Sequence, residues 1–324
     1  MKVCHWVMMN GSGMRHVAES MANNEKKLGL DSYLCDFAKP DDYLMHVDAD
    51  VHVAHTHFPD SFAEKITKPF KRVWIAHGGF DHVFQNSVET GLNKGYGAGD
   101  SFMLCQHQLR TCDASVTFWP RQQAIWQSMC DKNTKVHLVS LGVEKDFWKP
   151  MESRGKYLGS PSLFTAENAH FCKWPLDLFI MWPWVWPKIS GSYLHAIYLP
   201  QDQHRWWSPF INRNGTAYRA IVSASRFEQT ELRNAFVSCD YYIGLVQKGD
   251  FNRVCLEANA CGIKTISYRG NPYSDYWLTE GDQREMAREL IAILKGEVEP
   301  RKKDEVPDAI ETAKAMKEND ESLS

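Results

Sequence analysis

The chain has 324 residues, of which 44% are hydrophobic and 24% are charged, and its formal net charge is −3. This length and composition exclude a generally disordered chain and are sufficient for two domains with separate cores. The small negative charge argues against a protein whose whole surface binds nucleic acid, although a local basic face is still compatible with it.

The first half of the chain alternates strand-like and helix-like segments. A helix-like segment, 13–29, ends in Gly29, and helical spacers separate the later strands. Runs rich in β-branched and aromatic residues predict strands at 2–9, 31–37, 49–58, 72–79, 114–120 and 135–143. Strands that alternate with helices are typical of a parallel sheet covered on both faces.

The second half repeats this alternation. Strands are expected at 162–166, 192–199, 217–224, 240–246 and 263–268, and helices at 175–189, 231–238 and 283–296. We therefore predict an α/β protein with two Rossmann-like doubly wound domains, 1–150 and 151–304, and a C-terminal helix near 305–324 that packs back on the first. Two such domains that face each other form a cleft, and ligands are expected there, at the carboxyl ends of the strands.

Cysteine usage and the N-terminus indicate a cytoplasmic protein. The nine cysteines form no CxxC pair, and several lie in apolar runs, where Cys acts as a small buried hydrophobe. The first apolar run lacks a following cleavage site and is interpreted as a strand. No stretch approaches the roughly 18 apolar residues that span a bilayer, so no transmembrane segment is expected.

Several segments carry residues suited to chemistry. Gly11 and Gly13, between the first strand and helix, either let the backbone approach an anionic ligand or form a plain structural turn. His77, at a strand end, is either a loop histidine or a donor to a bound sugar. His55 and His57 share one strand face, but no third ligand has convincing spacing, so no metal site is predicted.

Glu257 is the one acid in an otherwise apolar run, RVCLEANACGIKTIS, at 253–267. A carboxylate in such a setting must be paired, neutralised or bound to a ligand. Lys173, ahead of a predicted helix, is either a solvated lysine or a point charge for a phosphate.

Read together, these segments point to one family. The LEANACG run at 256–262, the LGVEKDFWKP segment at 141–150 and the region of Lys173 resemble the retaining GT-B glycosyltransferases of family 4. The resemblance implies that Glu257, at a helix start and held by backbone N–H groups, binds the ribose of a nucleotide sugar. It also implies that Lys173 and the Gly11–Gly13 loop contact the diphosphate, and that His77 contacts the donor sugar.

The chain departs from the family pattern at two places. The family's first Glu, eight residues before the second, is Gly249 here, and Asp250 beside it would take over contact with the sugar. The family's Arg five residues before the Lys is Asn168, so another cation would complete the diphosphate site: Arg253, Arg226 or Arg205.

The resemblance implies an enzyme that moves a sugar from a nucleoside diphosphate, with a UDP-sugar as the expected donor, to an acceptor hydroxyl. It also implies retention of anomeric configuration and no need for a metal or other cofactor. Other classes stay open: a GT-B-shaped phosphorylase, an epimerase, or a nucleotide-sugar-binding module without turnover, which the Gly249 and Asn168 departures suggest.

The acceptor is not specified by the sequence, and DNA, a soluble glycan and a protein are all open. A basic segment in the first half is either a solvated surface or the contact for a phosphate-rich acceptor; it comprises Lys65, Lys68, Lys71 and Arg72. The second alternative implies a DNA-modifying glycosyltransferase that acts on a hydroxymethylated base flipped out of the duplex.

Overall fold

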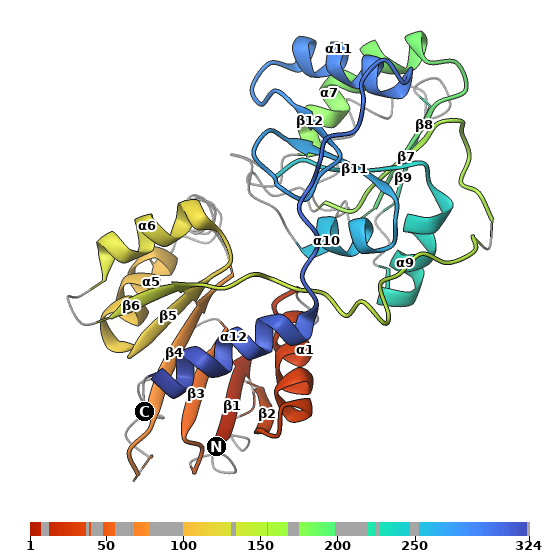
Figure 1. The fold of residues 1–324 in the computed structure, drawn as a ribbon. Coiled ribbons are helices and arrows are strands. Elements are labelled where there is room, and N and C mark those ends of the chain that lie inside the picture. The colour runs from red at the N-terminus through yellow and green to blue at the C-terminus, as the bar shows by residue number, and fades with distance from the viewer. Residues whose placement is uncertain are drawn as a thin grey trace. The chain divides into compact units, whose positions relative to one another are not determined.

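Two units, each with its own parallel sheet, make up the computed structural model of the protein (Figure 1). One comprises Met1–Glu144 and Pro307–Ser324, and the other Lys145–Val306. The structure describes residues 1–7, 13–36, 39, 48–55, 66, 68–77, 100–130, 134–153, 155–167, 175–197, 219–223, 227–246 and 253–322.

Six strands in the order β2-β1-β3-β4-β5-β6, all parallel, form the sheet of the first unit. Its strands are β1 (Lys2–Val7), β2 (Asp31–Asp36), β3 (Val51–Ala54), β4 (Lys71–Ala76), β5 (Ala114–Thr117) and β6 (Lys135–Leu138). The chain runs from β1 to β2 on one side and then crosses to β3 on the other. The switch point, where parallel sheets bind ligands, therefore lies between the carboxyl ends of β1 and β3.

The described helices of this unit are α1 (Gly13–Lys27), α5 (Asp100–Thr111), α6 (Pro120–Met129) and α12 (Ala309–Ser322). Helix α1 buries Ala18, Met21 and Ala22 on one face, spaced by three and four residues as a core-facing helix requires. Gly29 lies just past the end of this helix, and its φ of 82° is the left-handed conformation that terminates many helices. The core of the unit includes Trp74 and Trp126, which meet edge to face.

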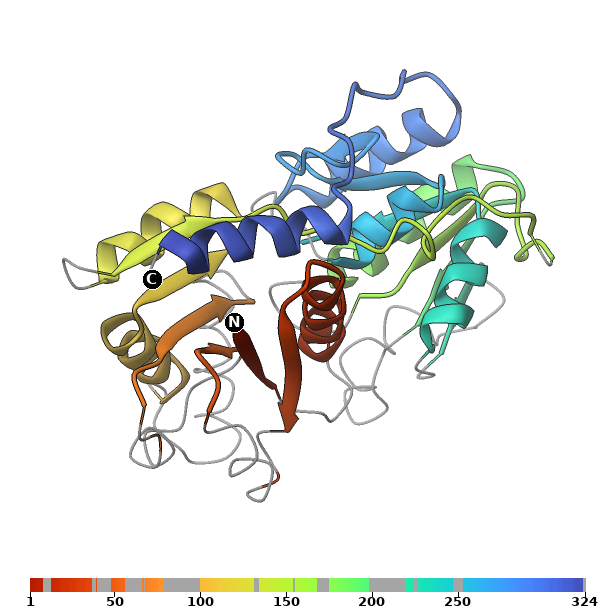
Figure 2. The same cartoon turned by 60° about the horizontal axis from the view of Figure 1, so that its bottom comes forward.

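Helix α12, from the C-terminus, lies beside α1 in this first unit (Figure 2). Its anchor is the buried Thr312, which accepts a hydrogen bond from the Gly142 N–H at 2.8 Å and donates one to the Ser140 carbonyl at 2.7 Å. A Cβ on Gly142 would collide with the backbone of Asp308, so the close approach requires glycine.

The second unit has six parallel strands in the order β12-β11-β10-β7-β8-β9. Its strands are β7 (Ser162–Thr165), β8 (Tyr193–Ala196), β9 (Ala220–Val222), β10 (Tyr241–Gly244), β11 (Lys264–Tyr268) and β12 (Tyr276–Leu278). The order reverses between β7 and β10, which is the switch point of this sheet. Two parallel sheets with helices confirm the predicted α/β class with two domains.

The described helices of the second unit are α7 (Pro175–Val185), the 3-10 turn η2 (Trp186–Lys188), α9 (Gln229–Ser238), α10 (Arg253–Ala260) and α11 (Gln283–Leu294). Helices α7 and α11 pack on each other and enclose Met181, Trp182 and Leu290. Asp282 caps α11 by accepting bonds from the backbone N–H groups of Arg284 and Glu285.

The units divide after Glu144, whereas the sequence placed the boundary at residue 150. Segment Lys145–Pro150 belongs with the second unit because its aromatic residues pack there. The ring of Trp148 contacts Phe236, and the Arg233 guanidinium lies over the Phe147 ring and donates to its carbonyl at 3.0 Å.

We predict that Thr312→Val loosens α12, because it leaves the Gly142 N–H and the Ser140 carbonyl without their partner. A buried unsatisfied polar group costs about 1–3 kcal/mol, so amide hydrogen exchange in α12 should speed up roughly 5- to 150-fold. Thr312→Ser keeps the hydroxyl and is the control. Equal exchange rates in the valine and serine variants would contradict this anchoring.

Candidate functional site

Two buried glutamates lie near the switch point of the second sheet. Glu167 follows the carboxyl end of β7 and is 1% exposed, and Glu257, on α10, is 5% exposed. Both act electrostatically on the buried Tyr242 of β10. The three side chains therefore form one cluster from adjacent elements, at the edge where parallel sheets bind ligands.

Tyr242 donates its hydroxyl proton to Glu167 Oε1 at 2.7 Å. Burial and the negative charge of Glu167 raise the pKa of Tyr242 well above its usual value, so the hydroxyl remains a donor. Gly244 leaves room for this pair, since a Cβ there would lie 2.9 Å from the tyrosine ring and 3.3 Å from Glu167 Oε1.

Glu257 forms a buried ion pair with Arg253, whose Nε lies 2.9 Å from Glu257 Oε1. The two residues are one helical turn apart on α10, so the helix itself brings them together. The sequence placed Glu257 at a helix start, held by backbone N–H groups. In the structure it is the fifth residue of α10, and the Arg253 side chain is a partner of its carboxylate.

The ion pair with Arg253 compensates the charge of Glu257 and so stabilises an acid within an apolar run. A carboxylate offers about four lone-pair sites on two oxygens, so it can accept several hydrogen bonds. A pre-oriented carboxylate at a switch point is chemically suited to accept hydrogen bonds from a pair of neighbouring hydroxyls.

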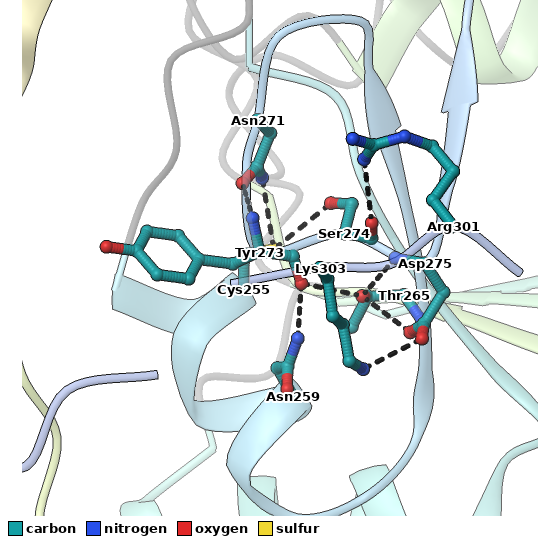
Figure 3. A network of polar contacts seen from close by, with 9 residues as sticks. All are labelled: Cys255, Asn259, Thr265, Asn271, Tyr273, Ser274, Asp275, Arg301 and Lys303. Atoms are coloured by element: carbon teal, nitrogen blue, oxygen red, sulfur yellow. Dashed lines mark hydrogen bonds and ion pairs between the residues drawn. The ribbon is translucent and has the colours of Figure 1, made fainter. Parts of the chain in front are cut away.

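A polar network fixes α10 against the neighbouring strands (Figure 3). The Asn271 amide donates to Cys255 Sγ on α10. Asp275 accepts bonds from the backbone N–H and hydroxyl of Thr265, on β11, and pairs with Lys303 at 2.8 Å. These contacts tie the helix that carries Glu257 to β11 and to the segment before β12.

In the first unit, His77 follows the carboxyl end of β4 and is half-buried. Its Nε2 lies 2.7 Å from Nδ1 of His55, which follows the end of β3. Gly13 is the first residue of α1, which begins at the same edge of the sheet, after β1. His77 and Gly13 are thus the predicted site residues that the structure describes at this edge.

The described part of the basic segment lies elsewhere. Lys68, Lys71 and Arg72 lie just before or at the amino end of β4, whereas His77 follows its carboxyl end. Lys68 pairs with Asp50 at 3.0 Å, so its charge is partly compensated. The remaining site residues chosen from the sequence fall outside the described residues: Gly11, Lys65, Asn168, Lys173, Arg226 and Asp250.

Neither Glu167 nor Tyr242 is among the site residues predicted from the sequence. The signal for Glu167 is present, since an acid directly follows the apolar strand SLFTA. Tyr242 carries no comparable signal, because its role comes from the pairing of β10 with β7.

Among the described residues, no group of three or more metal-ligating side chains converges, and no helix is long and apolar enough to cross a membrane.

No protein-family model matches the chain, and no curated protein sequence does either. Solved structures are similar over the whole length. The sucrose-phosphate synthase from Thermosynechococcus elongatus has a TM-score of 0.67 at 11% identity, covering 100% of this chain and 94% of that one. HepE of Anabaena in complex with UDP-glucose has a TM-score of 0.66 at 11% identity, covering 100% and 97%.

A third neighbour is trehalose-6-phosphate from E. coli bound with UDP-2-fluoro glucose, with a TM-score of 0.66 at 10% identity and 100% coverage of both chains. At these identities the likeness shows the fold alone. The chain therefore has the two-domain α/β fold of these proteins.

We predict that Tyr242→Phe destabilises the protein, because Glu167 loses a buried hydrogen-bond donor. The free energy of unfolding should fall by about 1–3 kcal/mol in urea titrations. Tyr241→Phe, on the same strand but outside this contact, is the matched control and should change it little. Equal losses in both variants would contradict the Tyr242–Glu167 pairing.

Proposed function

We propose that the protein is a glycosyltransferase that moves a sugar from a nucleoside-diphosphate sugar, a UDP-sugar, to an acceptor hydroxyl. The observation that carries the proposal is Glu257, a buried and pre-oriented carboxylate at the switch point of the second sheet. Support also comes from the fold, which is shared with solved structures that contain UDP-glucose or a UDP-2-fluoro glucose.

In this proposal Glu257 accepts hydrogen bonds from the two ribose hydroxyls of the donor. Arg253 holds the carboxylate in place and lies at the first residue of α10, where its charge and the helix N-terminus favour the donor diphosphate. The nucleotide thus meets an acid for its hydroxyls and a cation for its phosphates, a combination that distinguishes it from inorganic phosphate.

The other roles come from the family resemblance. Lys173 and the Gly11–Gly13 loop would contact the diphosphate, with Arg226 as a further cation near Asn168. His77 and Asp250 would contact the transferred sugar. Transfer with retention and without a metal belongs to the same proposal: side chains and helix N-termini would stabilise the leaving diphosphate.

The acceptor is assigned only as a compound with a hydroxyl group. The described basic residues of the segment considered for DNA lie at the amino end of β4, away from the carboxyl edge, so their position does not favour a DNA acceptor. The expected compartment is the cytoplasm, in line with the free thiols of the cysteines that the structure describes.

We predict that a UDP-sugar raises the melting temperature of the wild-type protein and that Glu257→Gln weakens its binding. Loss of one charge-assisted hydrogen bond corresponds to a roughly 10- to 100-fold higher Kd. Thermal melts measure the first effect, and calorimetric titrations with UDP-, GDP-, ADP- and dTDP-sugars measure the Kd. Glu297→Gln, an exposed glutamate in the same unit, is the control and should bind like wild type.

Slow hydrolysis of the bound donor without an acceptor would distinguish an enzyme from a binding module without turnover. Binding of a donor with no release of free sugar would support the module. No binding of any nucleotide sugar, or equal binding by both glutamate variants, would contradict the proposed donor site.

A further inference from the structure

A continuous chain of buried polar side chains crosses the first sheet and ends at His77. Each member comes from a different element: Ser32 from β2, Glu25 from α1, His5 from β1, His55 after β3 and His77 after β4. Glu25, His5 and His55 are each at most 1% exposed. This row of side chains thus links the interior of the unit to the carboxyl edge of its sheet.

Neighbouring side chains in this row lie at hydrogen-bond distance from one another. Glu25 Oε2 accepts from the Ser32 hydroxyl at 2.7 Å and lies 2.8 Å from His5 Nε2. His5 Nδ1 is 3.0 Å from His55 Nε2, and His55 Nδ1 is 2.7 Å from His77 Nε2. The ring centroids are 5.2 and 4.9 Å apart, as expected for imidazoles joined edge to edge through nitrogen atoms.

His55, in the middle, is held neutral. Burial, together with the neighbouring His77 and His5, lowers its pKa well below the usual value. A neutral imidazole has one N–H and one lone pair, and both nitrogens of His55 face another histidine. The two hydrogen bonds of His55 must therefore run in the same direction at any one time, one accepted and one donated.

Two directions are possible, and they differ by one proton. In the first, His77 Nε2 donates to His55, His55 Nε2 donates to His5, and His5 Nε2 donates to the Glu25 carboxylate. Nδ1 of His77 then carries a lone pair. In the second, every bond between histidines is reversed, and His77 carries its proton on Nδ1.

We propose that Glu25, His5 and His55 form a proton relay that sets whether His77 presents an acceptor or a donor at the carboxyl edge of the first sheet. A proton that binds Nδ1 of His77 releases the Nε2 proton to His55 Nδ1. His55 releases its own Nε2 proton to His5 Nδ1. The added charge ends on the buried His5–Glu25 pair, and His77 and His55 are neutral before and after.

The carboxylate makes the inner end of the chain the favourable place for this charge, since an opposite charge in hydrogen-bond contact stabilises an imidazolium. His55 does not hold the charge, because burial and its two histidine neighbours disfavour its charged form. Glu25 faces His5 in this row of side chains, and His5 and His77 face His55. Glu25, His5 and His55 act through His77 and are positioning residues.

The relay differs from a metal site, because its histidine nitrogens point at one another in pairs and not at a common centre. It gives His77 a ligand preference that depends on pH. In the deprotonated state His77 meets a group that donates, such as a hydroxyl, and in the protonated state one that accepts, such as a phosphate oxygen. The coupling between the histidines is argued from their contacts alone, whereas the identity of the ligand at His77 rests on the proposed function.

Side-chain ¹⁵N NMR of histidine-labelled protein over a pH series tests the relay without any ligand. With falling pH, we expect His77 and His55 to change together from the Nε2–H to the Nδ1–H tautomer at the midpoint at which His5 gains its second proton. Conversion of His77 itself to an imidazolium, at a midpoint that His5 does not share, would overturn the proposal.

Variants test the direction of the effect. Glu25→Gln removes the charge that stabilises the protonated state, so the common midpoint should fall by roughly 1–3 pH units. His52→Phe is the matched control: His52 is a buried histidine on β3 that accepts from Trp6 Nε1, outside the chain, and its loss should leave the midpoint in place. An unchanged midpoint in Glu25→Gln would overturn the relay.

His55→Phe interrupts the chain and provides a second measurement if Glu25→Gln does not fold. In this variant His77 should become an imidazolium with its own midpoint, and the shared transition with His5 should disappear. Retention of the shared transition without His55 would show that the coupling does not pass through this residue, which also overturns the proposal.

Discussion

A carboxylate that leaves water must find hydrogen-bond donors inside the protein, and the functional parts of this molecule are arranged around that constraint. Glu257 takes Arg253 as its partner, Glu167 takes the Tyr242 hydroxyl, and Glu25 takes His5 and Ser32. Each partner comes from the same or a neighbouring element, so the fold itself supplies it. Because two of these acids lie near the switch point of the second sheet, the compensated charge is located where a ligand can meet it.

Both sheets carry polar side chains at the carboxyl edge, but the types of side chain differ. In the second unit the strand order reverses between β7 and β10, and the side chains near that point are acids, a tyrosine and an arginine. In the first unit the corresponding edge carries His77 and the start of α1. Acidic and cationic groups suit the hydroxyls and phosphates of a nucleotide, whereas a histidine whose proton can move suits a sugar hydroxyl. The two sheets thus carry different types of polar contact at their carboxyl edges.

The sequence predicted the architecture better than the contacts. Alternating strand and helix patterns are local, and they indicated two parallel sheets and most of their strands. Among the described strands, β12 was not predicted. Glu257 was recognised because an acid in an apolar run is visible in one segment. The partners were harder to predict. Glu25, His5, His55 and His77 are far apart in the chain and meet only because β1, β3 and β4 are adjacent in the sheet. Arg253 was expected to face phosphate, and its bond to Glu257 follows from the four-residue spacing of the two residues within α10.

The most direct test of the proposed donor site is a crystal structure of the protein grown with UDP. We expect nucleotide density at the carboxyl ends of β7 and β10, with the ribose hydroxyls within hydrogen-bond distance of the Glu257 carboxylate and with Arg253 still paired to it. UDP bound elsewhere, with no contact to Glu257, would contradict the central claim that this buried acid recognises the nucleotide.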